Sequence, residues 1–254
     1  SLVADASCDF TDAGTLALTE NVLTPKNLQI NIDLCKQNLL DSFESLQMRA
    51  GAGAPPPASF DDYVISYMGE IIANGVEASV WSGTGATGGE FEGFLTATTG
   101  AFAVDGTVNT STASAAYTAS NLIANLQTLT ADMATDISAV LRKEDLHIYM
   151  SPKTYALYVS AVSTLGYVNA YNMNGDYAPV FEGYKIAVCN GMPNNQLVAA
   201  EKSNLFFGTD LLGDQTRIAL MDMAALDGSD NMRLVARYSG GVQLGIGADI
   251  VHQS

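Results

Sequence analysis

Apolar residues recur every three or four positions in the stretch SNLIANLQTLTADMATDISAVLRK, residues 120–143. This spacing places them on one face of a helix. Ser120 suits the N-cap position, and Arg142 with Lys143 suit the negative end of a helix. We therefore predict a long helix of roughly 35 Å at ~1.5 Å per residue. The following residues, EDLHIYMSPKTYALYVSAV, predict a short strand, a stop at Ser-Pro and a second helix.

A period-two pattern marks the N-terminal part of the chain. Apolar and polar residues alternate in residues 16–18 and again in residues 28–34, which is typical of strands. Residues 23–27 (LTPKN) between them indicate a turn. We predict a two-stranded hairpin over residues 14–36, after an irregular acidic arm at residues 1–13. Such a ribbon is marginal alone in water, so we expect it to lie on another surface.

The rest of the chain mixes helices and strands. Ser59 begins a helical pattern over residues 59–81, and Ser59 with Asp62 three residues on resembles a capping arrangement. The apolar face of that helix predicts a buried set: Phe60, Val64, Tyr67, Met68, Ile71 and Ile72. Short strands are predicted near residues 184–188, 196–200, 204–208, 218–223, 232–238 and 242–250. Long helices together with several strands predict an α+β fold.

Composition limits the function classes. The formal net charge is −16, and the 11 basic residues form no cluster, so a phosphate-binding groove is not expected. The charged fraction of 15% is low, which suggests that neighbouring molecules cover much of the surface. Cys8, Cys35 and Cys189 are odd in number and far apart, so we expect buried free thiols in a reducing compartment.

Two further features concern targeting. No apolar run approaches the ~20 residues that span a membrane, and no signal peptide is recognisable. The sequence begins at Ser1 without an initiator Met, from which we expect a processed, truncated or partly disordered N-terminus.

The residues that could carry chemistry are sparse. Residues 83–88 (GTGATG) match the letters of a dinucleotide-binding loop, but helical residues precede them and no helical pattern follows. His147 and His252 lie outside any zinc motif, and a structural role is the expected one. The acidic residues Asp222, Asp227 and Asp230 miss the spacing of an EF-hand loop, and residues 109–111 (NTS) form a glycosylation sequon only in a secreted protein. We predict no cofactor, no metal site and no enzymatic activity.

The order of elements resembles the major capsid proteins of tailed bacteriophages that have the HK97 fold. The resemblance covers residues 14–254 and rests on several segments in series. These are the hairpin, LLDSF, a helix ending in EASVWSGTG ahead of GFL, the long helix running into HIYMSPKTYALYVSAV, then PVFEGYKIAVCNGMP, NLFFGTD and the closing NMRLVARYSGGVQLGIGADIV.

The resemblance implies a structural subunit that assembles into pentamers and hexamers of an icosahedral shell around a viral genome. The hairpin would be an extended loop that reaches over a neighbouring subunit. Residues 37–151 with 229–254 would form a peripheral domain containing the long spine helix, and residues 152–228 an axial domain. It further implies a virion location, assembly in the host cytoplasm, double-stranded DNA held without sequence-specific contacts, and portal, scaffolding or cement proteins as further partners.

The same resemblance places Pro25, Lys26 and Asn27 at the tip of the hairpin as candidates for contact between subunits. Some relatives cross-link covalently through a lysine in this loop, and Lys26 is the residue here that would serve, with a solvated or ion-paired lysine as the ordinary alternative. Two other functions stay open. One is an encapsulin-like shell that encloses cargo enzymes, and the other is a soluble enzyme that uses the glycine-rich loop at residues 83–89.

Overall fold

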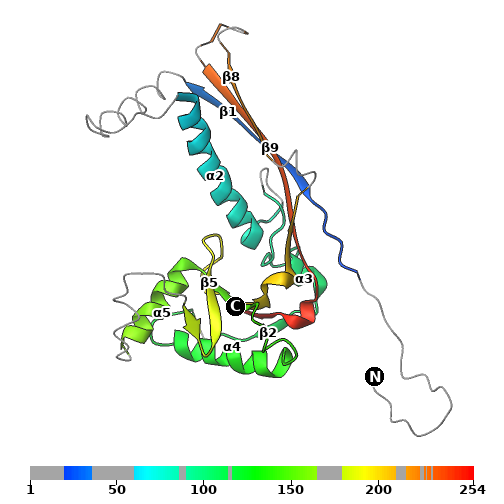
Figure 1. Cartoon of the computed structure of the whole chain (residues 1–254), viewed down its shortest axis with the longest axis vertical. Coiled ribbons are helices and arrows are strands. Elements are labelled where there is room, and N and C mark those ends of the chain that lie inside the picture. The colour runs from blue at the N-terminus through cyan, green and yellow to red at the C-terminus, as the bar shows by residue number, and fades with distance from the viewer. Residues whose placement is uncertain are drawn as a thin grey trace, which may run out of the picture.

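The computed structural model describes residues 20–35, 60–85, 90–113, 116–164, 179–209, 216–223, 226, 228–229 and 231–254. These residues form two connected parts (Figure 1). The upper part is a long helix beside a narrow antiparallel sheet, and the lower part is a second sheet with helices around it. The mixture confirms the predicted α+β class.

Strand β9 (Asn231–Leu244) is the centre of the first sheet. Strand β1 (Lys26–Cys35) pairs with it antiparallel over residues 231–240, and β8 (Thr216–Asp222) pairs with residues 232–238 from the opposite edge. Strand β7 (Leu205–Gly208) pairs with the last four residues of β9. Helix α2 (Phe60–Ser82) contacts β8 and β9. Because side chains alternate along a strand, Leu28 and Leu234 are buried on one face of this sheet.

The second sheet has six strands in the order β2-β10-β6-β3-β5-β4. Their bounds are β2 Asn109–Ser111, β10 Val251–Gln253, β6 Leu197–Glu201, β3 Leu146–Met150, β5 Tyr184–Val188 and β4 Val180–Phe181. Helices α4 (Leu122–Asp136) and α5 (Pro152–Thr164) pack on one side of it, and the short helix α3 (Ala101–Asp105) lies on the other. The turns η2 (Lys202–Asn204) and η3 (Gly247–Asp249) are 3-10 helices.

Both faces of this second sheet are buried, and strand β6 shows why. Leu197 and Ala199 belong to the core under α4 and α5, whereas Val198 and Ala200 belong to a second core with Trp81. A strand that is covered on both sides reads as an unbroken apolar run, as LVAA does here. The second core includes residues from the end of α2, so it joins the two parts of the molecule.

The helix expected over residues 120–143 is shorter than predicted. Helix α4 ends at Asp136, and residues 138–142 form turns. The apolar periodicity continues past the helix because Ile137 and Val140 remain almost fully buried in the same core. The longest described helix is α2, with 23 residues against 15 in α4.

The predicted hairpin is corrected in one respect. The strand expected at residues 28–34 is confirmed as part of β1, but its partner is β9, about 200 positions away in the chain. Residues 20–25 contain no strand, and the first strand expected at residues 16–18 lies outside the described residues. The boundary expected between residues 151 and 152 stays a prediction. The residues on its two sides share one core, in which Leu126 and Ile148 pack with Tyr158.

Candidate functional site

Residues 20–25 lie along the end of β9 and are held there by side-chain hydrogen bonds. The amide of Asn21 donates to the carbonyl oxygens of Leu244 (3.2 Å) and Gly245 (3.1 Å) and to Asp105 Oδ2 (3.0 Å). The amide of Gln243 donates to the Val22 carbonyl at 3.1 Å. These bonds fix the entry of the chain into β1.

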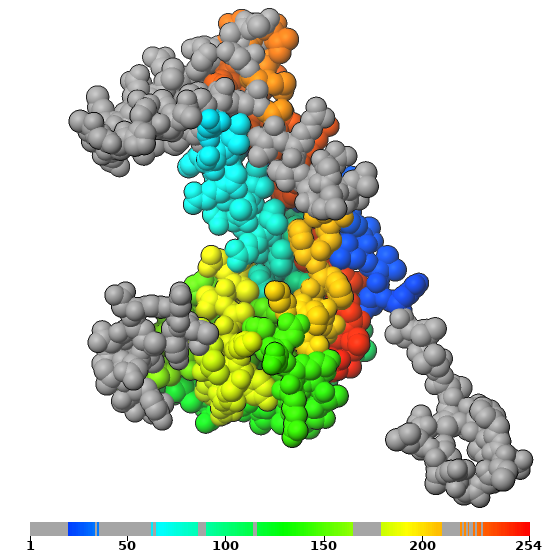
Figure 2. All heavy atoms as spheres, in the orientation of Figure 1, coloured from blue at the N-terminus to red at the C-terminus, as the bar shows by residue number. Residues whose placement is uncertain are grey.

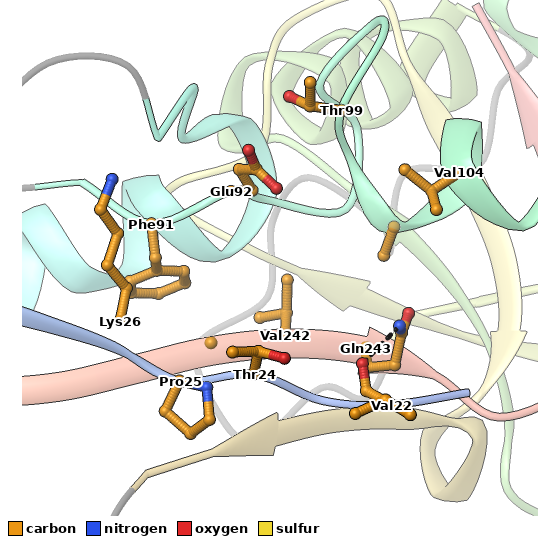
Figure 3. A pocket seen from close by; sticks show the side chains of 12 residues that line it. Val22, Thr24, Pro25, Lys26, Phe91, Glu92, Thr99, Val104, Val242 and Gln243 are labelled. Carbon is orange, nitrogen blue, oxygen red and sulfur yellow. Dashed lines mark hydrogen bonds between the residues drawn. The ribbon is translucent and has the colours of Figure 1, made fainter. Parts of the chain in front are cut away.

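The three candidate contact residues lie where this segment becomes a strand. Lys26 and Asn27 are the first two residues of β1, so Lys26 begins a strand and does not occupy the tip of a turn. Pro25 and Lys26 line a cavity of about 410 Å³ between this segment, β9 and the residues after α2 (Figure 3). The Lys26 ammonium donates to the Gly85 carbonyl. Asn27 is exposed and does not line the cavity.

The cavity walls carry few charges. Glu92 is the only carboxylate and Lys26 the only cation among the lining residues, which otherwise include Phe91, Val104 and Val242 (Figure 3). Phe91 is buried, and its ring centroid lies 6.1 Å from that of Phe207. The cavity therefore lies at the contact between residues 22–26 and the residues that follow α2, including Phe91 and Glu92.

Helix α2 leaves much of its apolar surface in contact with solvent. Tyr67 is 54% and Ile71 is 46% exposed, although the sequence predicted both on the buried face. Met68 is buried as predicted, and the side chains of Phe60 and Val64 lie outside the described set. Figure 2 shows α2, coloured cyan, uncovered on this face of the molecule. Exposed apolar patches of this kind mark interaction sites in soluble proteins.

A shallow groove of about 530 Å³ runs along the same helix. Its wall on α2 is made of small and branched residues, and Phe207 of β7, which is 51% exposed, forms the opposite side. The α2 residues that line it are Gly69, Ile72, Ala73, Val76, Glu77 and Val80. The sequence analysis did not predict this surface, because it assigned the apolar residues of α2 to one buried face. These residues cover more of the helix circumference than one packed face needs, and that excess was the signal that could have revealed the surface.

The far end of α2 is fastened to the second part of the fold by Glu77. Its Oε1 accepts hydrogen bonds from the backbone N–H groups of Asn190 (2.7 Å) and Gly191 (3.3 Å). A Cβ at Gly191 would lie 2.2 Å from the Glu77 carbonyl oxygen, so only glycine fits. The neighbouring Cys189 is half-buried, and burial with the Glu77 charge raises the pKa of its thiol to about 11. Such a thiol is protonated and unreactive near neutral pH.

The glycine-rich loop follows the C-terminal end of α2. Gly83 packs against the backbone, because a Cβ there would lie 2.1 Å from the Phe91 carbonyl oxygen. A bound pyrophosphate needs the N-terminal end of a helix, where N–H groups are free and the dipole is positive. Gly83 stands at the opposite end, and residues 86–89 lie outside the described residues.

The remaining candidates have structural surroundings. His147 Nδ1 donates to the Asp145 carbonyl at 2.7 Å. His252 is largely buried, with its ring centroid 6.0 Å from that of Phe102, and burial lowers the pKa of this imidazole. Asn109 of the sequon donates from its amide to the Ala248 carbonyl at 2.9 Å. Asp227 and Asp230 lie outside the described residues.

Two kinds of feature are absent from the described part of the chain. It holds no group of three or more His, Cys, Asp or Glu side chains placed to bind a metal ion. None of its helices is both long and apolar enough to cross a membrane.

No protein-family model matches this sequence, and neither does any curated protein. Solved structures do match. The capsid of an empty GTA particle aligns with a TM-score of 0.58 at 15% identity, over 96% of this chain and 80% of that one. A subunit in the procapsid of satellite phage P4, which includes a size determination protein, aligns at 0.54 and 10% identity, over 100% and 86%. A chain of the holo-SrpI encapsulin complex from Synechococcus elongatus aligns at 0.52 and 10% identity, over 92% and 74%.

These likenesses confirm the predicted fold. The chain has the HK97-like capsid fold, in which a long helix and an extended sheet are joined to a second, helix-covered sheet.

Proposed function

We propose that this chain is the major capsid protein of a tailed bacteriophage, which assembles into the pentamers and hexamers of an icosahedral shell around the genome. Two observations support the proposal. The fold is that of proteins solved as shells. The upper part of the molecule also exposes an apolar surface on α2 and β7 that the single chain leaves uncovered.

The exposed apolar surface is the observation that carries the proposal. Burying a large apolar side chain fully contributes about 1.5–3 kcal/mol, so covering a half-exposed one contributes roughly half of that. Tyr67, Ile71 and Phe207 are each about half exposed. A neighbouring subunit that covered these three would gain on the order of 3 kcal/mol in transfer free energy before the entropic cost of association. Repetition around a closed shell makes such modest contacts sufficient.

The charge of the chain is compatible with a container. At a net charge of −16 the subunits repel one another at low ionic strength, so assembly should strengthen with moderate salt. An acidic shell protein would enclose double-stranded DNA without binding it tightly. We propose a structural and not a catalytic role, a location in the virion after assembly in the host cytoplasm, and portal, scaffolding or cement proteins as further partners.

The two parts of the fold suggest the domain assignment. We assign α2 and the first sheet to the peripheral domain, with α2 as its spine helix. The second sheet, α4 and α5 then form the axial domain. This moves the expected boundary at residue 151 toward the N-terminus, because α4 and β3 share one core with α5. Pro25, Lys26 and Asn27 remain proposed contacts between subunits, and a cross-link through Lys26 would require release of its bond to Gly85.

An encapsulin-like shell is the alternative, since one of the matching structures is an encapsulin complex. The two functions differ in what the particle encloses. Native particles that contain protein cargo and no nucleic acid would favour the encapsulin, whereas particles with DNA would favour the capsid.

Particle formation tests the proposal. Purified chain, followed by sedimentation velocity and negative-stain microscopy, should give closed particles. Ile71→Glu places a charge on the exposed face of α2 and should leave a folded subunit that forms few particles. Thr128→Glu adds the same charge at an exposed position of α4 and should assemble normally. A wild-type chain that stays a monomer or dimer under all assembly conditions would contradict the proposal.

A further inference from the structure

The turn that follows β5 contains an asparagine followed by a glycine, Asn190 and Gly191. A hydrogen bond from the Met192 N–H to the Cys189 carbonyl, at 3.2 Å, closes this turn. The Asn190 side chain is exposed. Asparagine loses its amide most readily before glycine, because glycine has no Cβ to hinder the closure of a five-membered ring. The turn therefore has the composition of a site for spontaneous deamidation.

Deamidation of this pair needs only the chain itself and water. The backbone nitrogen of Gly191 attacks the side-chain carbonyl carbon of Asn190 and forms a new bond to it. The bond from that carbon to Nδ2 breaks, and the amide leaves as ammonia with the proton that the Gly191 nitrogen gives up. Water then opens the cyclic succinimide at one carbonyl to give aspartate, or at the other to give isoaspartate, whose backbone is longer by one methylene. Asparagine counts among the thermolabile residues of proteins.

Helix α2 holds the atom that would attack. Glu77 Oε1 accepts hydrogen bonds from the Asn190 N–H at 2.7 Å and from the Gly191 N–H at 3.3 Å. The Gly191 nitrogen must give up its proton to react, and a carboxylate beside it opposes the negative charge that then develops. Fast deamidation therefore requires the turn to separate from Glu77.

The backbone of α2 also restricts the turn. A Cβ at Gly191 would lie 2.2 Å from the Glu77 carbonyl oxygen and 2.6 Å from the Ala78 nitrogen. Ring closure has to move the Gly191 nitrogen toward the Asn190 side chain, and a contact this close opposes that movement. The products do not fit the contact either. An isoaspartate lengthens the backbone at this point, and an aspartate places a second negative charge near Glu77.

We propose that Asn190 is a deamidation site that Glu77 protects, and that the amide is lost in chains whose turn at residues 189–192 has separated from α2. Because ammonia leaves, the change is permanent. Both products weaken the contact between α2 and the second sheet, so a modified chain favours the separated arrangement. The site lies within one chain and would act in the same way whether or not copies of the chain form a shell.

Amide loss at Asn190 can be measured directly. The full-length chain is incubated in mildly alkaline buffer, and peptide mapping by mass spectrometry follows aspartate and isoaspartate at this position. The reference is the same chain unfolded in urea, in which the turn does not contact α2. Amide loss should be at least about tenfold slower in the folded chain, because a charge on the Gly191 nitrogen, 3.3 Å from Glu77 Oε1, is opposed by about that factor even at the dielectric constant of water.

Two variants of α2 isolate the role of the carboxylate. Glu77→Gln keeps the shape of the side chain and removes its charge, so it should speed amide loss at Asn190 in the folded chain about tenfold. Glu70→Gln is the matched control, since it removes the same charge from an exposed position of α2 away from the turn, and it should leave the rate unchanged. Asn174, which also precedes a glycine, gives a second rate in each chain that corrects for differences in conditions.

The consequence for the fold has its own test. Asn190→Asp reproduces one product and should lower the urea concentration at the midpoint of unfolding, whereas Asn190→Gln keeps a neutral amide and should not. Equal midpoints for the two variants would overturn the effect on the contact with α2.

Two results would overturn the protection by Glu77. One is an equal rate of amide loss at Asn190 in the folded and the unfolded wild-type chain. The other is an equal rate in folded Glu77→Gln and folded Glu70→Gln. Circular dichroism shows whether Glu77→Gln is folded. If it is not, the comparison of folded with unfolded wild type decides by itself.

Discussion

Gln253, the last residue of β10, provides the sharpest test of how the second sheet packs against α4. Its side chain is fully buried, and its Oε1 accepts a hydrogen bond from the Tyr117 hydroxyl at 3.0 Å. Its Nε2 donates to Ser111 Oγ at 3.0 Å and to the Asn125 carbonyl at 3.2 Å. One amide thus joins β10, β2, α4 and the segment before α4. We expect Gln253→Met, which keeps the length of the side chain, to break all of these bonds.

The magnitude follows from the groups that lose a partner. A buried polar group left without a hydrogen bond costs about 1–3 kcal/mol. The Tyr117 hydroxyl lies in a buried site, which raises the pKa of this phenol, and it would lose its acceptor. Ser111 is 5% exposed and would lose its donor. We therefore expect a loss of about 3 kcal/mol in the free energy of unfolding. For a chain of this length that lowers Tm by roughly 6 °C.

Urea denaturation followed by circular dichroism measures this loss, with every variant at one protein concentration because assembly makes stability concentration-dependent. Tyr117→Phe removes the donor alone. The double variant should cost less than the sum of the two single variants, since neither partner is then left unpaired. Gln127→Met is the matched control. This side chain is exposed on α4, so the loss should stay within about 0.5 kcal/mol.

Two results would refute this reasoning. One is a Gln253→Met variant within about 0.5 kcal/mol of wild type, the range of ordinary surface substitutions. The other is strict additivity of Gln253→Met and Tyr117→Phe, which would mean that the two side chains do not depend on each other.

Two further predictions concern pH and glycine. Burial lowers the pKa of His252 below its ordinary 6.5, so below that pH the unfolded chain binds a proton that the folded chain does not. The free energy of unfolding should therefore fall as pH drops from 6.5 through the folded pKa. Denaturation curves of His252→Phe at several pH values should lack this part of the pH dependence. An identical pH dependence in the variant and the wild type would contradict the assignment. Gly75→Ala, in the middle of α2 with open space around the new methyl group, should raise the free energy of unfolding by about 0.5–1 kcal/mol. Gly191→Ala would clash with the Glu77 backbone and should lower the free energy of unfolding. Equal effects of the two substitutions in denaturation experiments would refute the close approach of Gly191 to Glu77.

The sequence predicted the elements whose patterns are local. Helix α2 was expected at residues 59–81 and spans Phe60–Ser82, and the strand expected at residues 184–188 is β5. The prediction for residues 120–143 failed for a physical reason. Apolar spacing reports which residues are buried, and Ile137 and Val140 are buried in turns that follow α4. Burial alone therefore does not fix the end of a helix.

The candidate site was harder to predict, because it depends on contacts between distant parts of the chain. Lys26 looked like the tip of a hairpin, since nothing local reveals that Gly85 is its partner. Tyr67 and Ile71 were predicted as core residues but are exposed in the single chain. An apolar residue has the same character in the sequence whether it packs inside its own subunit or against another one. A single sequence cannot separate these two cases.

The pairing of β1 with β9 shows how much one register decides. The alternation in residues 28–34 predicts a strand with two different faces, but it does not say which residues lie opposite. Pairing with β9 places Asp33 opposite Arg233 and Leu28 opposite Tyr238. A slip of one residue would turn Leu28 and its apolar neighbours to solvent and would bury Asp33 on the opposite face. Burial on one face therefore fixes the register, and the register in turn places Gln29 opposite Arg237 and Asp33 opposite Arg233. The ion pair between Arg233 and Asp33 is thus a consequence of how the core of the first sheet packs.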